Sequence, residues 1–185
     1  MVEHAPHTKN LGWEYVYNEN NTDPVLGDQF LSEAYYRADD EYQGRTTVPA
    51  LIDTTTGKVV NNDYNWLTTY FEVNFRPWHK KDAPELYPVE LREEIDKMNL
   101  WLFDNINNAV YRSSFSRSNE GHFDGVNTFY AAMEQLEKRL ETNRFLFGDY
   151  VTDSDIRLYV TLSRLDIRYT AQLGETKHPL YTYKN

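Results

Sequence analysis

The sequence predicts an α+β to mainly α protein, with a small α/β lobe over residues 1–78 and an all-helical lobe over residues 79–185. Three observations predict this division. Before about residue 80 the chain consists of short β-branched segments and turn clusters, whereas after it apolar residues recur every three or four positions. Residues 76–85 hold two prolines and several charges, which is typical of a linker.

The first lobe is expected to contain a loop, a helix, a hairpin and a closing helix. Residues 11–28 are rich in Asn, Asp and Gly and predict a loop, and the apolar spacing that follows predicts a helix over 28–40. A β-branched segment at 46–52 is followed by turn residues and by an apolar segment at 58–60, which predicts a β-hairpin. Asp63 then opens a helix with Trp66 and Phe71 on one side.

The second lobe is expected to contain three amphipathic helices, because its apolar residues step at helical intervals. Pro88 fits the first turn of the first helix, where a missing N–H has no cost. The apolar positions of the first helix are Leu91, Ile95, Met98, Leu102 and Ile106. Those of the second are Val126, Phe129, Tyr130, Met133, Leu136 and Leu140, and those of the third are Ile156, Tyr159, Leu162 and Leu165.

The composition excludes several classes of function. A net charge of -10 disfavours binding to nucleic-acid phosphates. No apolar run approaches the roughly 18 residues of a membrane span, so we expect a cytoplasmic protein without membrane partners. The 185 residues include no cysteine, which excludes disulfides, thiolate metal sites and a cysteine nucleophile. His4 and His7 have no nearby thiol or carboxylate partner, and no metal site is predicted.

Six strings in this chain carry a family resemblance. They are GWEY at residues 12–15, YQGRTTVPAL at 42–51, GKVVNND at 57–63, LYP at 86–88, NNAVYR at 107–112 and TDSDIRL at 152–158. Over roughly residues 11–169 the chain resembles glutathionyl-hydroquinone reductases, the Xi-class, omega-like branch of the glutathione S-transferase family. The resemblance implies a partial thioredoxin-like lobe followed by a helical glutathione-transferase C-terminal lobe.

The resemblance implies a glutathione site in the first lobe. Trp13 would lie against glutathione, or alternatively cover apolar surface as a loop tryptophan. Val48 would precede a cis proline and pair with glutathione through its backbone. Asp63 stands where the family has a Glu that holds the γ-glutamyl group, but it could equally be a simple helix cap. Tyr64 replaces the family's small Ser beside it, which makes glutathione binding doubtful here.

The resemblance also implies roles for four residues of the helical lobe. Tyr111 and Tyr169 match tyrosines that line a hydroquinone pocket, although both could be ordinary core residues. Thr152 and Asp155 are interpreted as a structural capping pair at the start of the third helix. Quinol-type small molecules are therefore the expected partners, and a homodimer is possible.

One departure from the family decides the expected activity. The family carries a Cys-Pro-Trp-Ala motif in a strand and helix before the Gly-Trp string, whereas about ten residues precede Gly12 here. The family reaction is a thiol exchange that needs a thiolate, so no catalytic residue is predicted and this chain should be inactive. Three interpretations stay open: an enzyme completed by a further segment, a non-catalytic binding or scaffold protein, and a fragment.

Overall fold

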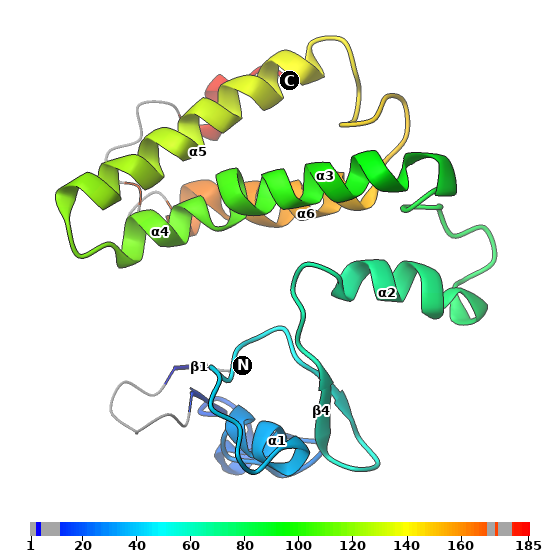
Figure 1. The fold of residues 1–185 in the computed structure, drawn as a ribbon, viewed down its shortest axis with the longest axis vertical. Coiled ribbons are helices and arrows are strands. Elements are labelled where there is room, and N and C mark those ends of the chain that lie inside the picture. The colour runs from blue at the N-terminus through cyan, green and yellow to red at the C-terminus, as the bar shows by residue number, and fades with distance from the viewer. Residues whose placement is uncertain (1–2, 5–11, 170–172, 174–178) are drawn as a thin grey trace. The chain divides into compact units, whose positions relative to one another are not determined.

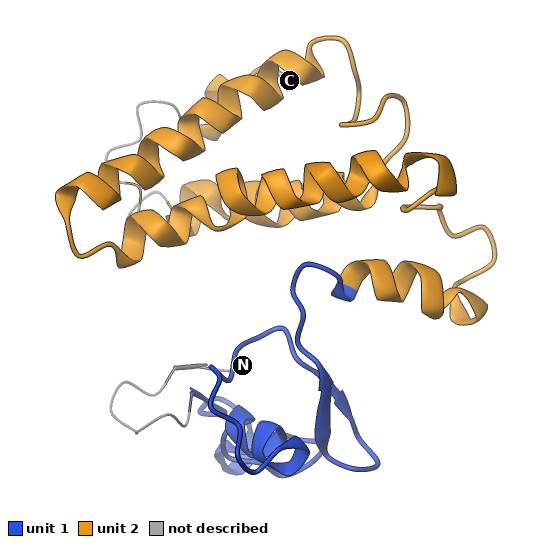
Figure 2. Cartoon of the chain, viewed as in Figure 1, with its two compact units in different colours: residues 1–67 blue, residues 68–185 orange. Residues whose placement is uncertain are grey.

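Residues 3–4, 12–169, 173 and 179–185, which the computed structural model describes, belong to two units that cover residues 1–67 and 68–185 (Figures 1 and 2). The sequence placed the lobe boundary after residue 78. The compact units of the structure divide between Leu67 and Thr68, so the helix after its first residue falls in the helical unit, where Thr68 hydrogen bonds to Asp153 and Arg157.

Unit 1 contains two short antiparallel strand pairs and one helix. Its elements are β1 (Glu3–His4), β2 (Trp13–Glu14), the short 3₁₀ segment η1 (Glu19–Asn21), α1 (Leu31–Ala38), β3 (Leu51–Asp53) and β4 (Lys58–Asn61). β1 pairs with β2, and β3 pairs with β4. The predicted helix and hairpin are therefore present. The expectation of a loop over residues 11–28 is wrong at β2, which also bridges from Glu14 to Phe30.

A side-chain cap and one part-buried ion pair fix α1 in this unit. The carboxylate of Glu33 accepts the N–H groups of Gln29 and Phe30 at 2.8 and 2.9 Å, so the helix has its N-terminal acceptor inside its own first turn. From the last turn Arg37 pairs with the buried carboxylate of Asp28 and donates through Nε to the Gly57 carbonyl at 2.9 Å. The helix therefore holds both the preceding loop and the hairpin turn.

The hairpin strand is shorter than the sequence predicts. Residues 46–50 lie outside the strand, and β3 begins only at Leu51. Pro49 lacks an N–H and cannot donate to a strand ladder, which explains the late start. The Val48–Pro49 peptide bond is cis, as expected from the resemblance.

The described regular structure of unit 2 is helical apart from an isolated β-bridge between Phe145 and Gly148. It contains α2 (Leu67–Asn74), α3 (Arg92–Leu102), η4 (Phe103–Asn107), α4 (Ala109–Phe115), α5 (Asn119–Leu140), α6 (Asp153–Leu162) and η5 (Leu165–Tyr169), with short 3₁₀ segments η2 (Arg76–Trp78), η3 (Val89–Leu91) and η6 (Leu180–Thr182). All three predicted amphipathic helices are present, as α3 with η4, α5, and α6. Two of the segments, η4 and η5, are π-helical turns, which the sequence did not predict.

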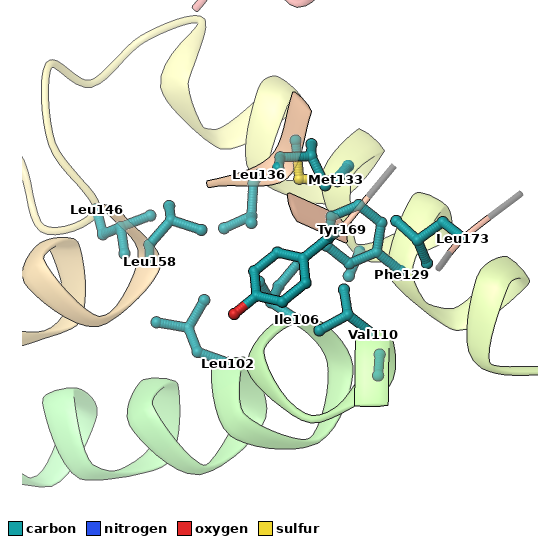
Figure 3. Close-up of a cluster of buried hydrophobic side chains, with 13 residues drawn as sticks. Leu102, Ile106, Val110, Phe129, Met133, Leu136, Leu146, Leu158, Tyr169 and Leu173 are labelled. Carbon is teal, nitrogen blue, oxygen red and sulfur yellow. The ribbon is translucent and has the colours of Figure 1, made fainter. Parts of the chain in front are cut away.

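The core of unit 2 is one cluster of buried side chains from η4, α4, α5, α6 and η5, joined by Leu102 at the end of α3 (Figure 3). Its members are Leu102, Ile106, Ala109, Val110, Phe129, Ala132, Met133, Leu136, Leu146, Leu158, Leu165, Tyr169 and Leu173. Burying this much apolar surface from helices far apart in the sequence is the main stabilising contribution to the unit.

Candidate glutathione and aromatic sites

Val48 lies at an exposed position in the loop before β3. The Val48 side chain is 49% exposed, and none of the hydrogen bonds between described residues uses its N–H or C=O. The carbonyl of the preceding residue, Thr47, accepts the Tyr35 hydroxyl at 2.6 Å, which holds the loop in place. Val48 is thus an edge that could pair with an extended ligand.

Tyr35 joins the two loops that carry Val48 and Asp63. It is only 3% exposed, and its hydroxyl interacts with both Thr47 and Asn62. Burial raises the pKa of Tyr35, and the hydrogen bonds to Asn62 and Thr47 act against that rise. Sequence reasoning treated Tyr35 only as an apolar helix position, because helical spacing cannot show what a hydroxyl contacts.

Asp63 is engaged at the start of a helix. Its side-chain oxygen accepts the N–H of Asn65 at 3.0 Å, and its carbonyl accepts the N–H of Trp66 and Leu67 at 3.3 and 2.9 Å. These bonds satisfy donors that would otherwise have no partner in the first turn. The geometry therefore matches the capping interpretation of Asp63 and leaves less of its carboxylate for a ligand amine.

The Gly-Trp string packs beside the same loop. Gly12 has a φ of +74°, and a Cβ atom added to it would lie 2.2 Å from the Thr46 side-chain oxygen. Only glycine fits such an approach without a shift. Trp13 follows in β2 and is half-buried. Unit 1 thus brings the strings containing Trp13 and Val48 together through Gly12 and Thr46.

Tyr111 and Tyr169 meet in unit 2, although 58 positions separate them in the sequence. Their hydroxyl oxygens are 3.2 Å apart, and their rings meet edge to face with centroids 5.9 Å apart. Tyr169 is 4% exposed and Tyr111 42% exposed. Phe115 stacks on Tyr111 at 6.2 Å from the other side. Two phenol groups, one of them reachable from solvent, therefore lie within one aromatic cluster.

Thr152 and Asp155 form the cap of α6. The Asp155 carboxylate accepts both the N–H and the hydroxyl of Thr152, each at 2.8 Å. Its second oxygen accepts the N–H of Leu146 at 2.8 Å, a contact that sequence reasoning missed. One carboxylate therefore fixes the helix start and the loop from α5 together.

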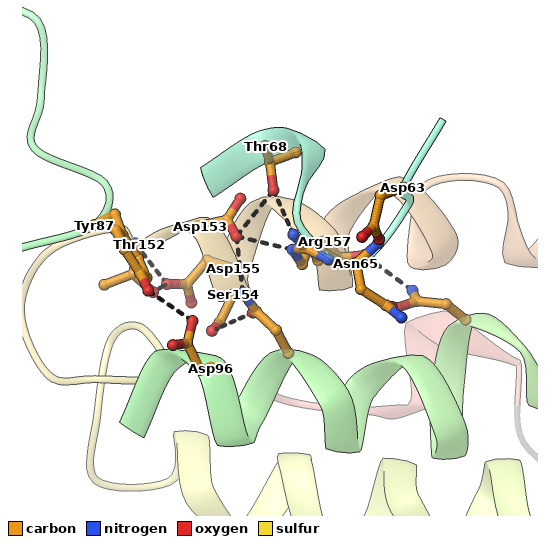
Figure 4. A network of polar contacts seen from close by, with 12 residues as sticks. Asp63, Asn65, Thr68, Tyr87, Asp96, Thr152, Asp153, Ser154, Asp155 and Arg157 are labelled. Atoms are coloured by element: carbon orange, nitrogen blue, oxygen red, sulfur yellow. Dashed lines mark hydrogen bonds and ion pairs between the residues drawn. The ribbon is translucent and has the colours of Figure 1, made fainter. Parts of the chain in front are cut away.

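A buried polar network centred on Asp153 runs through the same region (Figure 4). Its carboxylate accepts from Arg157 Nε at 2.8 Å, from Asn99 Nδ2 at 2.8 Å and from Thr68 Oγ1 at 3.2 Å. Ser154 donates to Asn99 Oδ1 at 2.7 Å. Sequence reasoning missed this network, although Asn99 and Asn107 fall on the face of their helix that also carries Ile95, Leu102 and Ile106.

Neither a metal site nor a membrane helix is found among the described residues. No group of three or more His, Asp or Glu side chains in that part of the chain could hold a metal ion. Within the same residues, no helix is long and apolar enough to cross a membrane.

Comparisons with known proteins identify the relatives of this chain. A profile for the glutathione S-transferase C-terminal domain matches residues 108–179. The glutathionyl-hydroquinone reductase YqjG of Escherichia coli is 34% identical over 163 residues, which are 88% of this chain and 49% of that protein. The glutathione S-transferase omega-like 2 of Schizosaccharomyces pombe is 32% identical over 90% of this chain and 56% of that protein.

Solved structures agree with these relatives. The glutathione-bound structure of YqjG superposes with a TM-score of 0.84 at 32% identity, over 94% of this chain and 56% of that one. Glutathione transferase Xi 1 from Trametes versicolor has the same TM-score at 33% identity, over 94% of this chain and 62% of that one. These structures confirm the predicted fold class. The chain spans about half the length of the curated relatives it matches.

Proposed function

We propose that this chain, which resembles glutathionyl-hydroquinone reductases over most of its length, is a glutathione transferase-family protein whose 185 residues bind quinol-type aromatics without performing thiol exchange. The observation that carries the proposal is the absence of cysteine from these residues. A thiolate must attack sulfur in such an exchange, and neither Tyr nor Ser can replace it. Any enzymatic turnover would need a thiol from outside these residues.

The aromatic cluster of unit 2 supports the binding half of the proposal. A quinol ring could lie against Phe115 and Tyr111 while its hydroxyl groups exchange hydrogen bonds with the phenols of Tyr111 and Tyr169. Aromatic walls with a few convergent polar groups are typical of small-molecule sites. The 42% exposure of Tyr111 provides access from solvent.

Glutathione binding is proposed to be weak. The exposed backbone of Val48 supports a contact with the peptide part of glutathione, and Trp13 lies in the string packed beside that loop. Asp63 already accepts a helix N–H, so binding a ligand amine would compete with the cap. Tyr64 fills a position where the resemblance implies a small hydroxyl.

Calorimetric titration of the 185-residue chain with hydroquinone tests the proposal. Tyr111→Phe should weaken binding roughly three- to tenfold, the value of about one hydrogen bond. Tyr181→Phe, at an 82% exposed position, is the matched control and should bind as the parent does. Equal affinity of all three proteins would place the ligand elsewhere, and no binding by the parent would refute the proposed site.

Self-association and location belong to the same proposal. Apolar side chains on α6 and η5 are exposed, namely Ile156, Tyr159, Val160 and Ile167, and they support a homodimer through this face. Sedimentation of the parent against Tyr159→Lys would test it, since the charge should shift a dimer to monomer. We retain the cytoplasm as the proposed location from composition alone.

A further inference from the structure

Asn107 connects the two helical segments that carry Tyr111 and Tyr169. It lies at the end of η4, it is 6% exposed, and its Nδ2 donates to the Arg157 carbonyl at 3.1 Å and to the Thr161 side-chain oxygen at 2.7 Å. The acceptors are on α6, just before η5. A carbonyl oxygen can only accept, so the amide orientation of Asn107 is fixed by this contact.

The two tyrosines each follow or end a π-helical turn. The N–H of Asn108 bonds to the carbonyl of Phe103 at 2.8 Å, which closes the turn ahead of Tyr111. Tyr169 ends η5, and its N–H bonds to the Arg164 carbonyl at 3.4 Å. Turns of this kind interrupt the regular helical register and occur frequently at functional sites.

The segment that runs from α3 into η4 contacts α6 at matching intervals up to Asn107, but the intervals no longer match after it. Eight residues separate Asn99 from Asn107, and seven separate their partners Ser154 and Thr161, so the segments run side by side in the same direction. Beyond this contact, four residues lead to Tyr111 but eight lead from Thr161 to Tyr169. In straight helices, four and eight residues rise about 6 and 12 Å along the axis. The interruption after α6 must therefore shorten the second path for the two tyrosines to meet.

We propose that Asn107 is a positioning residue: its amide locks η4 to the last regular turn of α6 and thereby sets the distance at which the phenols of Tyr111 and Tyr169 meet. The Asn107–Thr161 contact is the last one with matching intervals before α6 ends at Leu162 and η5 begins at Leu165. Without this contact, the segments that carry the two tyrosines would no longer be held at a fixed spacing. The Asn107 Oδ1 atom is buried without a partner among the described residues. An apolar replacement therefore removes the free-energy cost of burying that oxygen as well as the hydrogen bonds to α6.

The inference deepens the proposed quinol site but can be tested without a ligand. Protein with isotope-labelled tyrosine rings should show a proton–proton NMR cross peak between Tyr111 and Tyr169, assigned with Tyr111→Phe and Tyr169→Phe. Asn107→Leu should abolish this cross peak or weaken it severalfold. The matched control is Asn105→Leu, because Asn105 lies in the same π-helical turn and donates to the Trp101 carbonyl at 2.8 Å within its own helix.

Each outcome decides the inference. A folded Asn107→Leu protein with an unchanged cross peak would overturn it, as would an equal loss in Asn105→Leu. If Asn107→Leu does not fold, Thr161→Val removes only the side-chain acceptor and should weaken the cross peak in the same direction; unchanged intensity would refute the role. Failure of the parent to bind hydroquinone, with the cross peak still dependent on Asn107, would contradict the quinol proposal and support this one.

Discussion

At the start of α6, one carboxylate accepts hydrogen bonds from two parts of the chain. Thr152→Ala should lower the free energy of unfolding by about 1–2 kcal/mol, the usual value of a cap. Asp155→Ala should cost more, roughly 3 kcal/mol, because it also frees the N–H of Leu146. Urea unfolding measures both. Ser118→Ala, at the exposed cap of α5, is the control and should cost less than either; an Asp155→Ala variant as stable as Thr152→Ala would contradict the double role.

Tyr87 gives the helical unit a dependence on alkaline pH. Burial, followed by the hydrogen bond to Asp96, raises the pKa of Tyr87 to about 12. The native phenol therefore keeps its proton where the unfolded phenol, with a pKa near 10, loses it. This contribution to stability is fully present below pH 10 and is lost as pH rises from about 10 to 12, by at most roughly 3 kcal/mol.

Urea unfolding at pH 8, 10 and 11 should show this loss. Above pH 10 the free energy of unfolding should fall less steeply with pH in Tyr87→Phe than in the parent, by the slope that about one titrating proton contributes. Tyr181→Phe should leave the slope unchanged. Identical slopes in the parent and Tyr87→Phe would show that the phenol titrates alike in both states.

At the level of elements, α4 and α5 pack closely at one glycine. A Cβ on Gly125 would lie 2.7 Å from the backbone nitrogen of Ser113, so the helices must separate to admit it. Gly125→Ala should therefore destabilise the protein by about 1–3 kcal/mol, despite the better helix propensity of alanine. Gly121→Ala in the same helix meets only the side chains of Ser116 and Ser118, which can move, and should be tolerated. Thermal unfolding of the two variants would refute the close packing if Gly125→Ala were the more stable.

Helix positions could be predicted from the sequence, whereas helix interruptions and tertiary contacts could not. α5 follows from apolar spacing and α6 from the cap of Thr152 and Asp155, which are local signals. The apolar positions Ile156 and Tyr159 predicted for the third helix are exposed, and α6 buries Arg157, Leu158 and Thr161 instead. The π-helical turn at η4 leaves the apolar steps at Leu102 and Ile106 unchanged, so spacing cannot reveal it. Asn99, a partner of Asp153, and Thr161, a partner of Asn107, each lie 54 residues away along the chain and depend on packing.

The same limit applies to the candidate site. The pairing of Tyr111 with Tyr169 was expected only from the family resemblance, because nothing in the spacing of two tyrosines brings them together. The contact of Asp63 with the first helical turn could be predicted as a cap. The contacts of the Tyr35 hydroxyl with Thr47 and Asn62 could not be predicted, since they depend on how the loops on either side of the hairpin fold.

For the whole molecule, the two units differ in how much apolar surface they bury. Among the described residues of unit 1 the buried apolar side chains are Leu31, Ala34, Tyr35 and Leu67, whereas the cluster of unit 2 joins six helical segments. Amides of residues 92–162 should therefore exchange with deuterium more slowly than those of residues 12–61. Hydrogen-exchange mass spectrometry checks this, and equal protection of both ranges would contradict it.

The central claim is that these 185 residues retain a family binding surface without the family's thiol chemistry. Its most direct test is reduction of a glutathionyl-hydroquinone by the purified 185-residue chain in the presence of glutathione, compared with glutathione alone. We expect equal rates, because loss of the nucleophile of a covalent mechanism typically lowers the rate by several orders of magnitude. A rate clearly above that of glutathione alone, and abolished by Tyr111→Phe, would contradict the claim.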